Sequence, residues 1–179
     1  IITVSRSLLV ALALLLFPGW GIAGDSVTFD STDELEARGA VVSAFGGVDI
    51  PQGRPALRQF AADGQEVVVV ALGLMDVTRG ATPAQQRWRV RAALNDLRTV
   101  RCVIWVDLRL YSALHGPTWP AEAAAFNRIL AEEAPHVARW SAYSHAHRSW
   151  FRADGFHPNR VGQEAYARFL AGQVDRYCN

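Results

Sequence analysis

The stretch EVVVVAL, residues 66–72, decides the fold class of this chain. Apart from its first residue it is an unbroken apolar run of strand length, with Gly64 shortly before it and Gly73 directly after it. A strand of this composition is buried on both faces, as in a parallel sheet covered by helices, whereas a strand with one solvated face alternates between apolar and polar residues. The stretch therefore predicts a central strand of an α/β domain.

Strand-like runs and helical patterns alternate on both sides of this stretch. Further strands are expected just before Gly24 and at 40–45, 102–108 and 136–143. Helices are expected at 31–39, 54–64, 82–99, 119–135 and 159–177. Alternation at this spacing predicts a three-layer α/β/α sandwich around a mostly parallel, five-stranded sheet.

Two of the expected helices begin with explicit capping signals. Thr82 followed by Pro83 is an N-cap residue with proline at the first helical position. Ser31 and Glu34 have the spacing of a capping box at the start of the 31–39 helix. Both signals place a helix start directly after a connecting loop.

Composition limits the classes of protein to which the chain can belong. It has 179 residues, 50% of them hydrophobic and 20% charged, with a formal net charge of +1. This is the composition of one globular domain rather than of a disordered chain. No basic patch interleaved with aromatic residues is present, so a nucleic-acid partner is not expected.

The N-terminal residues 1–18 read as an apolar leader. Arg6 precedes an apolar run at 8–17, as in a secretory signal, and the run is short for a membrane span. We therefore expect a signal peptide or membrane anchor at 1–18, a folded domain at 19–179, and an extracytoplasmic location. One alternative is a buried first strand with an apolar lead-in. Because the sequence begins with Ile1, a piece of a longer protein is a further alternative.

The chain has two cysteines, Cys102 and Cys178. They fit one disulfide in an exported protein, and they also fit two unrelated buried thiols.

Candidate site residues lie where parallel strands end, because α/β sites form on the loops after the strands. The loops are Gly24-Asp25-Ser26, Gly46-Gly47, Gly73-Leu74-Met75-Asp76 and, before the last helix, DGFHP at 154–158. In the last of them, Asp154 and His157 are three positions apart. This spacing lets a carboxylate hold one imidazole nitrogen while the other faces outward, as the base of a serine nucleophile requires. Taken alone, either end motif can be an ordinary turn.

Together, Gly24-Asp25-Ser26 and the DGFHP motif resemble the end motifs of the SGNH (GDSL-type) hydrolases, and the resemblance spans about residues 20–179. It implies a flavodoxin-like sandwich and a serine esterase that needs no metal or organic cofactor. Ser26 would be the nucleophile, His157 the general base and Asp154 the residue that orients the base. The implied reaction removes an acyl group, such as acetyl, from a carbohydrate or lipid ester. Transfer of the acyl group to a sugar hydroxyl is the alternative, and a non-catalytic carbohydrate-binding relic is the third.

The resemblance also implies an oxyanion hole, in which this sequence departs from the family. Its donors would be the backbone N–H groups of Ser26 and Gly47, with Gly46 as the nearby alternative, and an asparagine side chain. Met75 occupies the asparagine position and has no side-chain N–H. Loss of one oxyanion donor typically costs about 2.7–4 kcal/mol of transition-state stabilisation.

Several other residues are candidates for the substrate pocket or for a metal site. The pocket is expected to be lined by Asp25, Gly46, Asp76 and His115. Trp119 is either an apolar wall of that pocket or a packed side chain. His145 and His147 form a His-x-His pair, but no third ligand is suitably spaced, so no metal is expected. Arg79 and Arg109 are interpreted as solvated charges, and contact with an anionic substrate is the alternative.

Overall fold

The computed structural model describes residues 19–179, so the predicted leader at 1–18 lies outside the described residues. Within the described part, no helix combines the length and the apolar character needed to cross a bilayer.

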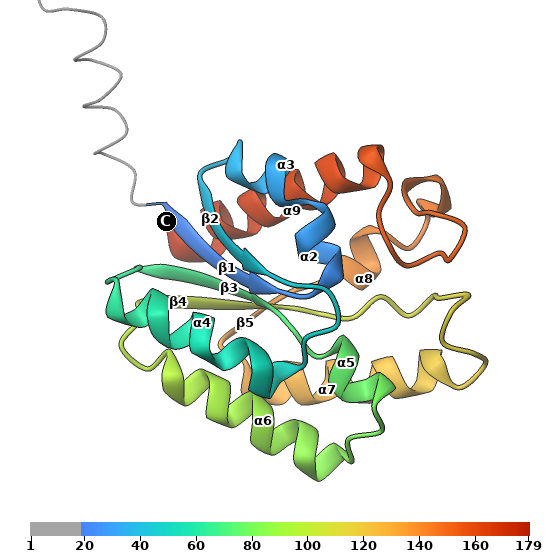
Figure 1. The fold of residues 1–179 in the computed structure, drawn as a ribbon, viewed down its shortest axis with the longest axis horizontal. Coiled ribbons are helices and arrows are strands. Elements are labelled where there is room, and N and C mark those ends of the chain that lie inside the picture. The colour runs from blue at the N-terminus through green and yellow to red at the C-terminus, as the bar shows by residue number, and fades with distance from the viewer. Residues whose placement is uncertain (1–18) are drawn as a thin grey trace, which may run out of the picture.

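The five strands form one parallel sheet with the order β2-β1-β3-β4-β5 (Figure 1). Their bounds are β1 Trp20–Gly24, β2 Ala40–Ala44, β3 Val67–Ala71, β4 Cys102–Val106 and β5 His136–Ala138. All four neighbouring pairs are parallel, which confirms the predicted sheet. The stretch that decided the fold class is the central strand, and Val68, Val69 and Val70 have no exposed surface.

Helices cover both faces of the sheet (Figure 1). Their bounds are α2 Ser26–Asp30, α3 Thr32–Glu36, α4 Ile50–Ala62, α5 Leu74–Thr78, α6 Pro83–Asp96, α7 Trp119–Glu133, α8 Trp140–Tyr143, η1 Arg148–Trp150 and α9 Arg160–Cys178. One layer contains α4, α5, α6 and α7, and the other contains α2, α3, α8 and α9. The three predicted layers are therefore present.

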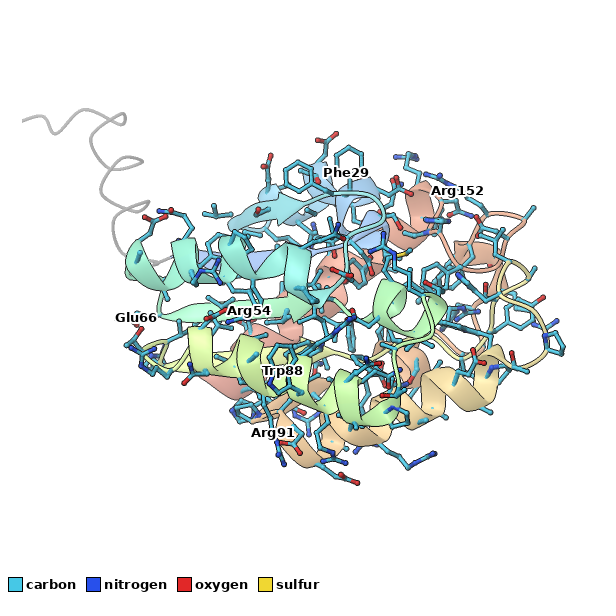
Figure 2. All side chains as sticks on the ribbon, turned by 60° about the horizontal axis from the view of Figure 1, so that its bottom comes forward. Phe29, Arg54, Glu66, Trp88, Arg91 and Arg152 are labelled. Carbon is cyan, nitrogen blue, oxygen red and sulfur yellow. A yellow bond between two sulfur atoms is a disulfide. The ribbon has the colours of Figure 1, made fainter. Side chains whose placement is uncertain are left out.

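Ion pairs join the helices of the first layer on its outer side. Arg54 of α4 contacts Asp96 of α6 at 2.6 Å, and Arg91 of α6 contacts Glu133 of α7 at 2.7 Å. Figure 2 shows Arg54, Trp88 and Arg91 on the solvent-facing side of these helices. Pairs of this kind at a protein surface contribute little each, so the buried sheet face supplies most of the layer's stability.

The predicted strand at 136–143 is wrong in its second half. The strand stops at Ala138, and residues Trp140–Tyr143 form the short helix α8. The carboxylate of Asp107 accepts hydrogen bonds from the backbone N–H of Ser141 at 2.7 Å and from its hydroxyl at 2.5 Å. These bonds turn the chain into a helix at the end of β5.

The predicted capping box at Ser31 is also wrong. Residues Ser26–Asp30 already form α2, and the Ser31 hydroxyl donates to the carbonyl of Val27 at 2.9 Å. The next helix, α4, begins at Ile50 rather than at 54, because Asp49 and Gln52 form a capping box there. Thr82 caps α6 as predicted.

Cys102 and Cys178 form a disulfide, with 5.7 Å between their Cα atoms. The bond joins the start of β4 to the end of α9. The C-terminus therefore lies at the end of the sheet where all five strands begin, close to the start of β1 (Figure 1).

We expect removal of this disulfide to destabilise the fold without altering the site at the opposite edge. The cysteines are 76 residues apart, and a loop of that length corresponds to about 4 kcal/mol of unfolding free energy in the chain-entropy model. Urea denaturation of the double variant Cys102→Ser, Cys178→Ser measures the loss. The native protein treated with a reductant should lose the same amount, and an unchanged midpoint in both experiments would contradict the expectation.

Candidate active site

Ser26, His157 and Asp154 form a continuous hydrogen-bonded chain. Ser26 begins α2 directly after β1, and its Oγ lies 3.0 Å from Nε2 of His157. On the other side of the imidazole, Nδ1 lies 2.9 Å from Oδ2 of Asp154. In this arrangement the carboxylate orients the imidazole, and the imidazole can take the proton of the hydroxyl as the hydroxyl oxygen attacks an electrophile. The structure thus brings together the two motifs, at 24–26 and 154–158, on which the sequence prediction depended.

A tight turn holds Asp154 against His157. Oδ1 of Asp154 accepts from the backbone N–H groups of Phe156 and His157, both at 2.8 Å. Burial raises the pKa of Asp154, but these N–H groups and the imidazole outweigh it, so the pKa lies below its ordinary value. Gly155 makes the bend with φ +69°, and a Cβ there would lie 2.4 Å from the ring of Tyr111. Glycine is required at this position for both reasons.

Arg109, interpreted from the sequence as a solvated charge, is buried beneath this turn. Its Nε donates to the carbonyl of Gly155 at 3.0 Å, and Nη1 donates to the carbonyl and hydroxyl oxygens of Ser144, both at 2.8 Å. The guanidinium also lies 3.8 Å from the ring centroid of Phe151. The prediction was wrong because the partners are backbone carbonyls distant in sequence. The only sequence signal was the position of Arg109 just after a buried strand.

Ser26 and Gly47, the predicted oxyanion donors, both have an unpaired backbone N–H. Neither N–H has an acceptor among residues 19–179. Arg79 holds the loop that contains Gly47: it donates to the Gly47 carbonyl at 2.9 Å, to Asp49 at 3.0 Å and to Gln52 at 3.1 Å. Arg79 is half-exposed, but its guanidinium is used in these contacts rather than simply solvated.

Gly46 follows β2 and Met75 follows β3, and the two residues differ in how far they are buried. Gly46 is exposed, and a Cβ added there would meet no atom within 4 Å. Met75 is the second residue of α5, so the stretch expected to be a loop is a helix start. The Met75 side chain is half-buried and packs against the core. It offers no N–H to the space beside Ser26.

Asp76 does not line a pocket, contrary to the prediction. Its side chain is fully buried, and its carboxylate accepts from the Ile50 N–H at 2.9 Å and from Arg89 at 2.7 Å. These bonds join the start of α4 and the middle of α6 to α5. Burial raises the pKa of Asp76 despite the opposing effect of Arg89.

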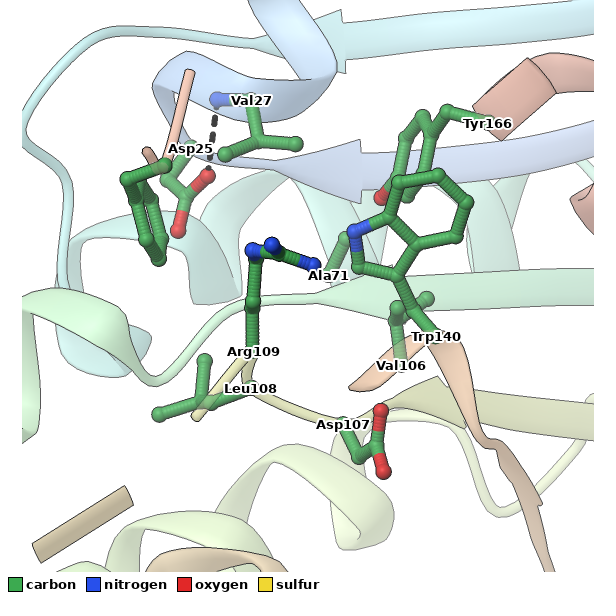
Figure 3. A pocket seen from close by; sticks show the side chains of 10 residues that line it. Asp25, Val27, Ala71, Val106, Asp107, Leu108, Arg109, Trp140 and Tyr166 are labelled. Atoms are coloured by element: carbon green, nitrogen blue, oxygen red, sulfur yellow. Dashed lines mark hydrogen bonds between the residues drawn. The ribbon is translucent and has the colours of Figure 1, made fainter. Parts of the chain in front are cut away.

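Asp25 is also buried, and it faces a cavity rather than an open substrate pocket (Figure 3). It caps α2 by accepting the Val27 N–H at 3.0 Å. The cavity has a volume of about 30 Å³, and Arg109, Phe156 and Tyr166 are among the other residues that line it. Such a volume holds a water molecule but no substrate group. Burial raises the pKa of Asp25 to about 7.

His115, predicted to line the substrate pocket, packs against Phe156, the residue before His157. Its ring stacks on Trp119 at 4.4 Å and meets the edge of Phe156 at 5.4 Å, while Nδ1 lies 2.7 Å from the Ser112 hydroxyl. Burial and the charge of His157 lower the pKa of His115, which favours its neutral form. Trp119 is fully buried and is a packed side chain, not a pocket wall.

His145 and His147 do not form a metal site in the structure. His147 stacks on Trp150 at 3.7 Å, and His145 is exposed. Between residues 19 and 179, no group of three or more His, Cys, Asp or Glu side chains could hold a metal ion.

Comparison by sequence finds no match among protein-family models, and no curated protein matches the chain either. Comparison by structure finds many similar solved structures. The lipase/acylhydrolase from Enterococcus faecalis superposes with a TM-score of 0.71 at 17% identity, over 90% of this chain and 97% of that one. The C-terminal catalytic domain of Streptococcus pneumoniae peptidoglycan O-acetyltransferase A gives a TM-score of 0.68 at 20% identity, over 88% and 93%.

A GDSL-like lipase from Bacteroides thetaiotaomicron is similar over 96% of this chain and 98% of its own, with a TM-score of 0.62 and 14% identity. At these identities the likeness concerns the fold. The chain therefore has the three-layer fold of the SGNH (GDSL-type) hydrolases, in agreement with the resemblance of its end motifs.

Proposed function

We propose that the protein is a serine esterase that cleaves acyl esters through Ser26, His157 and Asp154. The observation that carries the proposal is the unbroken contact of 3.0 Å and 2.9 Å from the serine hydroxyl through the imidazole to the carboxylate. The backbone N–H groups of Ser26 and Gly47, which have no acceptor among residues 19–179, support the proposal as candidate oxyanion donors.

In the proposed mechanism the Ser26 oxygen attacks the ester carbonyl while Nε2 of His157 takes the hydroxyl proton. The N–H groups of Ser26 and Gly47 stabilise the oxyanion that forms. Collapse of the tetrahedral intermediate releases the alcohol, which receives the proton from His157. Water then attacks the acyl-enzyme by the same route, and Asp154 keeps Nδ1 protonated throughout.

The proposed substrate is a carbohydrate or lipid that carries a short acyl group such as acetyl. The structural likeness to a peptidoglycan O-acetyltransferase domain supports a second candidate, in which a sugar hydroxyl replaces water as the acyl acceptor. The disulfide supports an oxidising, extracytoplasmic location, and the apolar sequence at 1–18 supports export or anchoring. Neither reaction requires a metal or an organic cofactor.

The first test of the proposal is covalent labelling by a fluorophosphonate probe. The native protein should label rapidly and Ser26→Ala not at all, because only an activated serine reacts quickly. Asp154→Asn should still fold, and its kcat on p-nitrophenyl acetate should fall by roughly a thousandfold or more. Ser43→Ala, which removes a serine of β2 that forms no hydrogen bond with His157, is the matched control and should label like the native protein. Equal labelling of Ser26→Ala would contradict the proposal.

The second test restores the missing oxyanion donor. Met75→Asn should raise kcat on p-nitrophenyl acetate about tenfold with little change in KM, because an added donor stabilises the transition state more than the ground state. Met75→Leu keeps an apolar side chain and should leave kcat unchanged. If both variants fold and the asparagine variant is no faster, the space beside Ser26 is not reached from position 75.

The third test concerns Asp25, a buried group that takes no part in the proposed mechanism. Its folded-state pKa of about 7 is above the unfolded value, so its favourable contribution is present below about pH 4 and is lost as the pH rises through 7. Asp25→Asn keeps a capping acceptor but cannot ionise. Relative to the native protein, its unfolding free energy should therefore increase between pH 4 and pH 8.5 by up to about 4 kcal/mol.

Urea denaturation at the two pH values measures this difference. The exposed carboxylate of Asp175 provides the control, since Asp175→Asn should show the same difference from the native protein at both pH values. A pH-independent difference for Asp25→Asn would show that Asp25 is already ionised in the folded protein at pH 4.

A further inference from the structure

An open groove of about 490 Å³ lies beside the turn that carries Asp154 and His157. Its lining residues are Arg109, Tyr111, His145, Ala146, Arg148 and Ser149. Tyr111 packs directly over Gly155, and Arg109 donates to the Gly155 carbonyl, so one wall of the groove is also the support of the proposed catalytic turn. The groove therefore adjoins the turn that carries two of the three proposed triad residues.

The groove is cationic, although the chain as a whole is nearly neutral. Its six lining residues include two arginines and one histidine but no aspartate or glutamate. Arg152 pairs with Asp30 at 2.9 Å, but neither Arg109 nor Arg148 forms an ion pair with any carboxylate of residues 19–179. Two guanidinium groups on one groove without a carboxylate partner favour an anion there.

Arg109 and Arg148 flank the ring of Tyr111. The Arg148 guanidinium lies 5.1 Å from the ring centroid and that of Arg109 lies 5.8 Å from it. The side chain of Arg109 is buried, and its Nη2 has no acceptor in the described part of the chain. Tyr111 itself is 46% exposed. The groove therefore presents an aromatic surface and hydrogen-bond donors of positive charge side by side.

We propose that this groove is a subsite for a carboxylated sugar residue next to the sugar that carries the ester. A guanidinium matches a planar carboxylate with two parallel hydrogen bonds, and an exposed tyrosine ring offers an apolar face with a polar edge to a pyranose. His145 and Ser149 add groups that can bind sugar hydroxyls. The inference rests on the proposed esterase function and assigns its substrate class, an acylated acidic glycan.

Binding tests the subsite independently of catalysis. Ser26→Ala protein is titrated by calorimetry with trigalacturonate and with the same trisaccharide after reduction of its carboxyl groups to alcohols. The acidic trisaccharide should bind about tenfold more tightly, and the further substitution Arg148→Gln should abolish that preference without affecting the neutral compound. Arg98→Gln, which removes the same charge from an exposed site on the far side of the sheet, is the matched control and should preserve the preference.

Kinetics of the enzyme with an intact Ser26 complete the test. On the O-acetylated forms of the two trisaccharides, Arg148→Gln should raise KM about tenfold for the acidic one and not for the neutral one, whereas Arg98→Gln should raise KM for neither. Equal affinity of the two trisaccharides, equal effects of Arg148→Gln and Arg98→Gln, or preferential binding of inorganic phosphate over galacturonate would each overturn the proposal. Absence of esterase activity together with a retained carboxylate preference would overturn the proposed function but not the subsite.

Discussion

Parallel strand pairing requires each connection to return the chain to the edge from which it started, so all five strands of this sheet end at one edge. The strand order β2-β1-β3 adds a second constraint, because the chain leaves β1 toward one side and later returns to its other side. The loop after β1 is thereby placed between the loops after β2 and β3. Ser26 consequently follows a strand flanked by the two strands that lead to Gly47 and Met75, at the kind of position where α/β sheets bind ligands.

The loop after β4 positions the remaining part of the site. Arg109 holds the carbonyl of Gly155, Tyr111 packs on the same residue, and the N–H of Ala113 donates to the Asp154 carbonyl at 2.8 Å. Three contacts from one loop thus fix a turn that carries two of the three proposed triad residues. Support by a neighbouring loop matters because misplacement of an imidazole by a fraction of an ångström reduces its efficiency as a base.

The sequence was most informative where local chemistry alone decides the structure. The apolar run of β3 and the Thr82 cap depend on neighbouring residues only, and both predictions were confirmed. The end motifs located the triad candidates because each contains its own turn. Long-range polar contacts were not predictable: Arg109 is buried by carbonyls from residues 144 and 155, and Asp76 by groups from residues 50 and 89. No pattern along the chain distinguishes such buried charges from solvated ones.

The disulfide and the start of β1 lie together at the edge of the sheet where the strands begin, and the proposed site lies at the edge where they end. The five-residue length of β1 thus separates Trp20 from the turn that presents Ser26. Because Cys102 anchors the last helix to that far edge, thermal fraying of the C-terminus is restrained there. A fusion partner or support joined to the C-terminal residue would therefore attach at the opposite end of the strands from the proposed site.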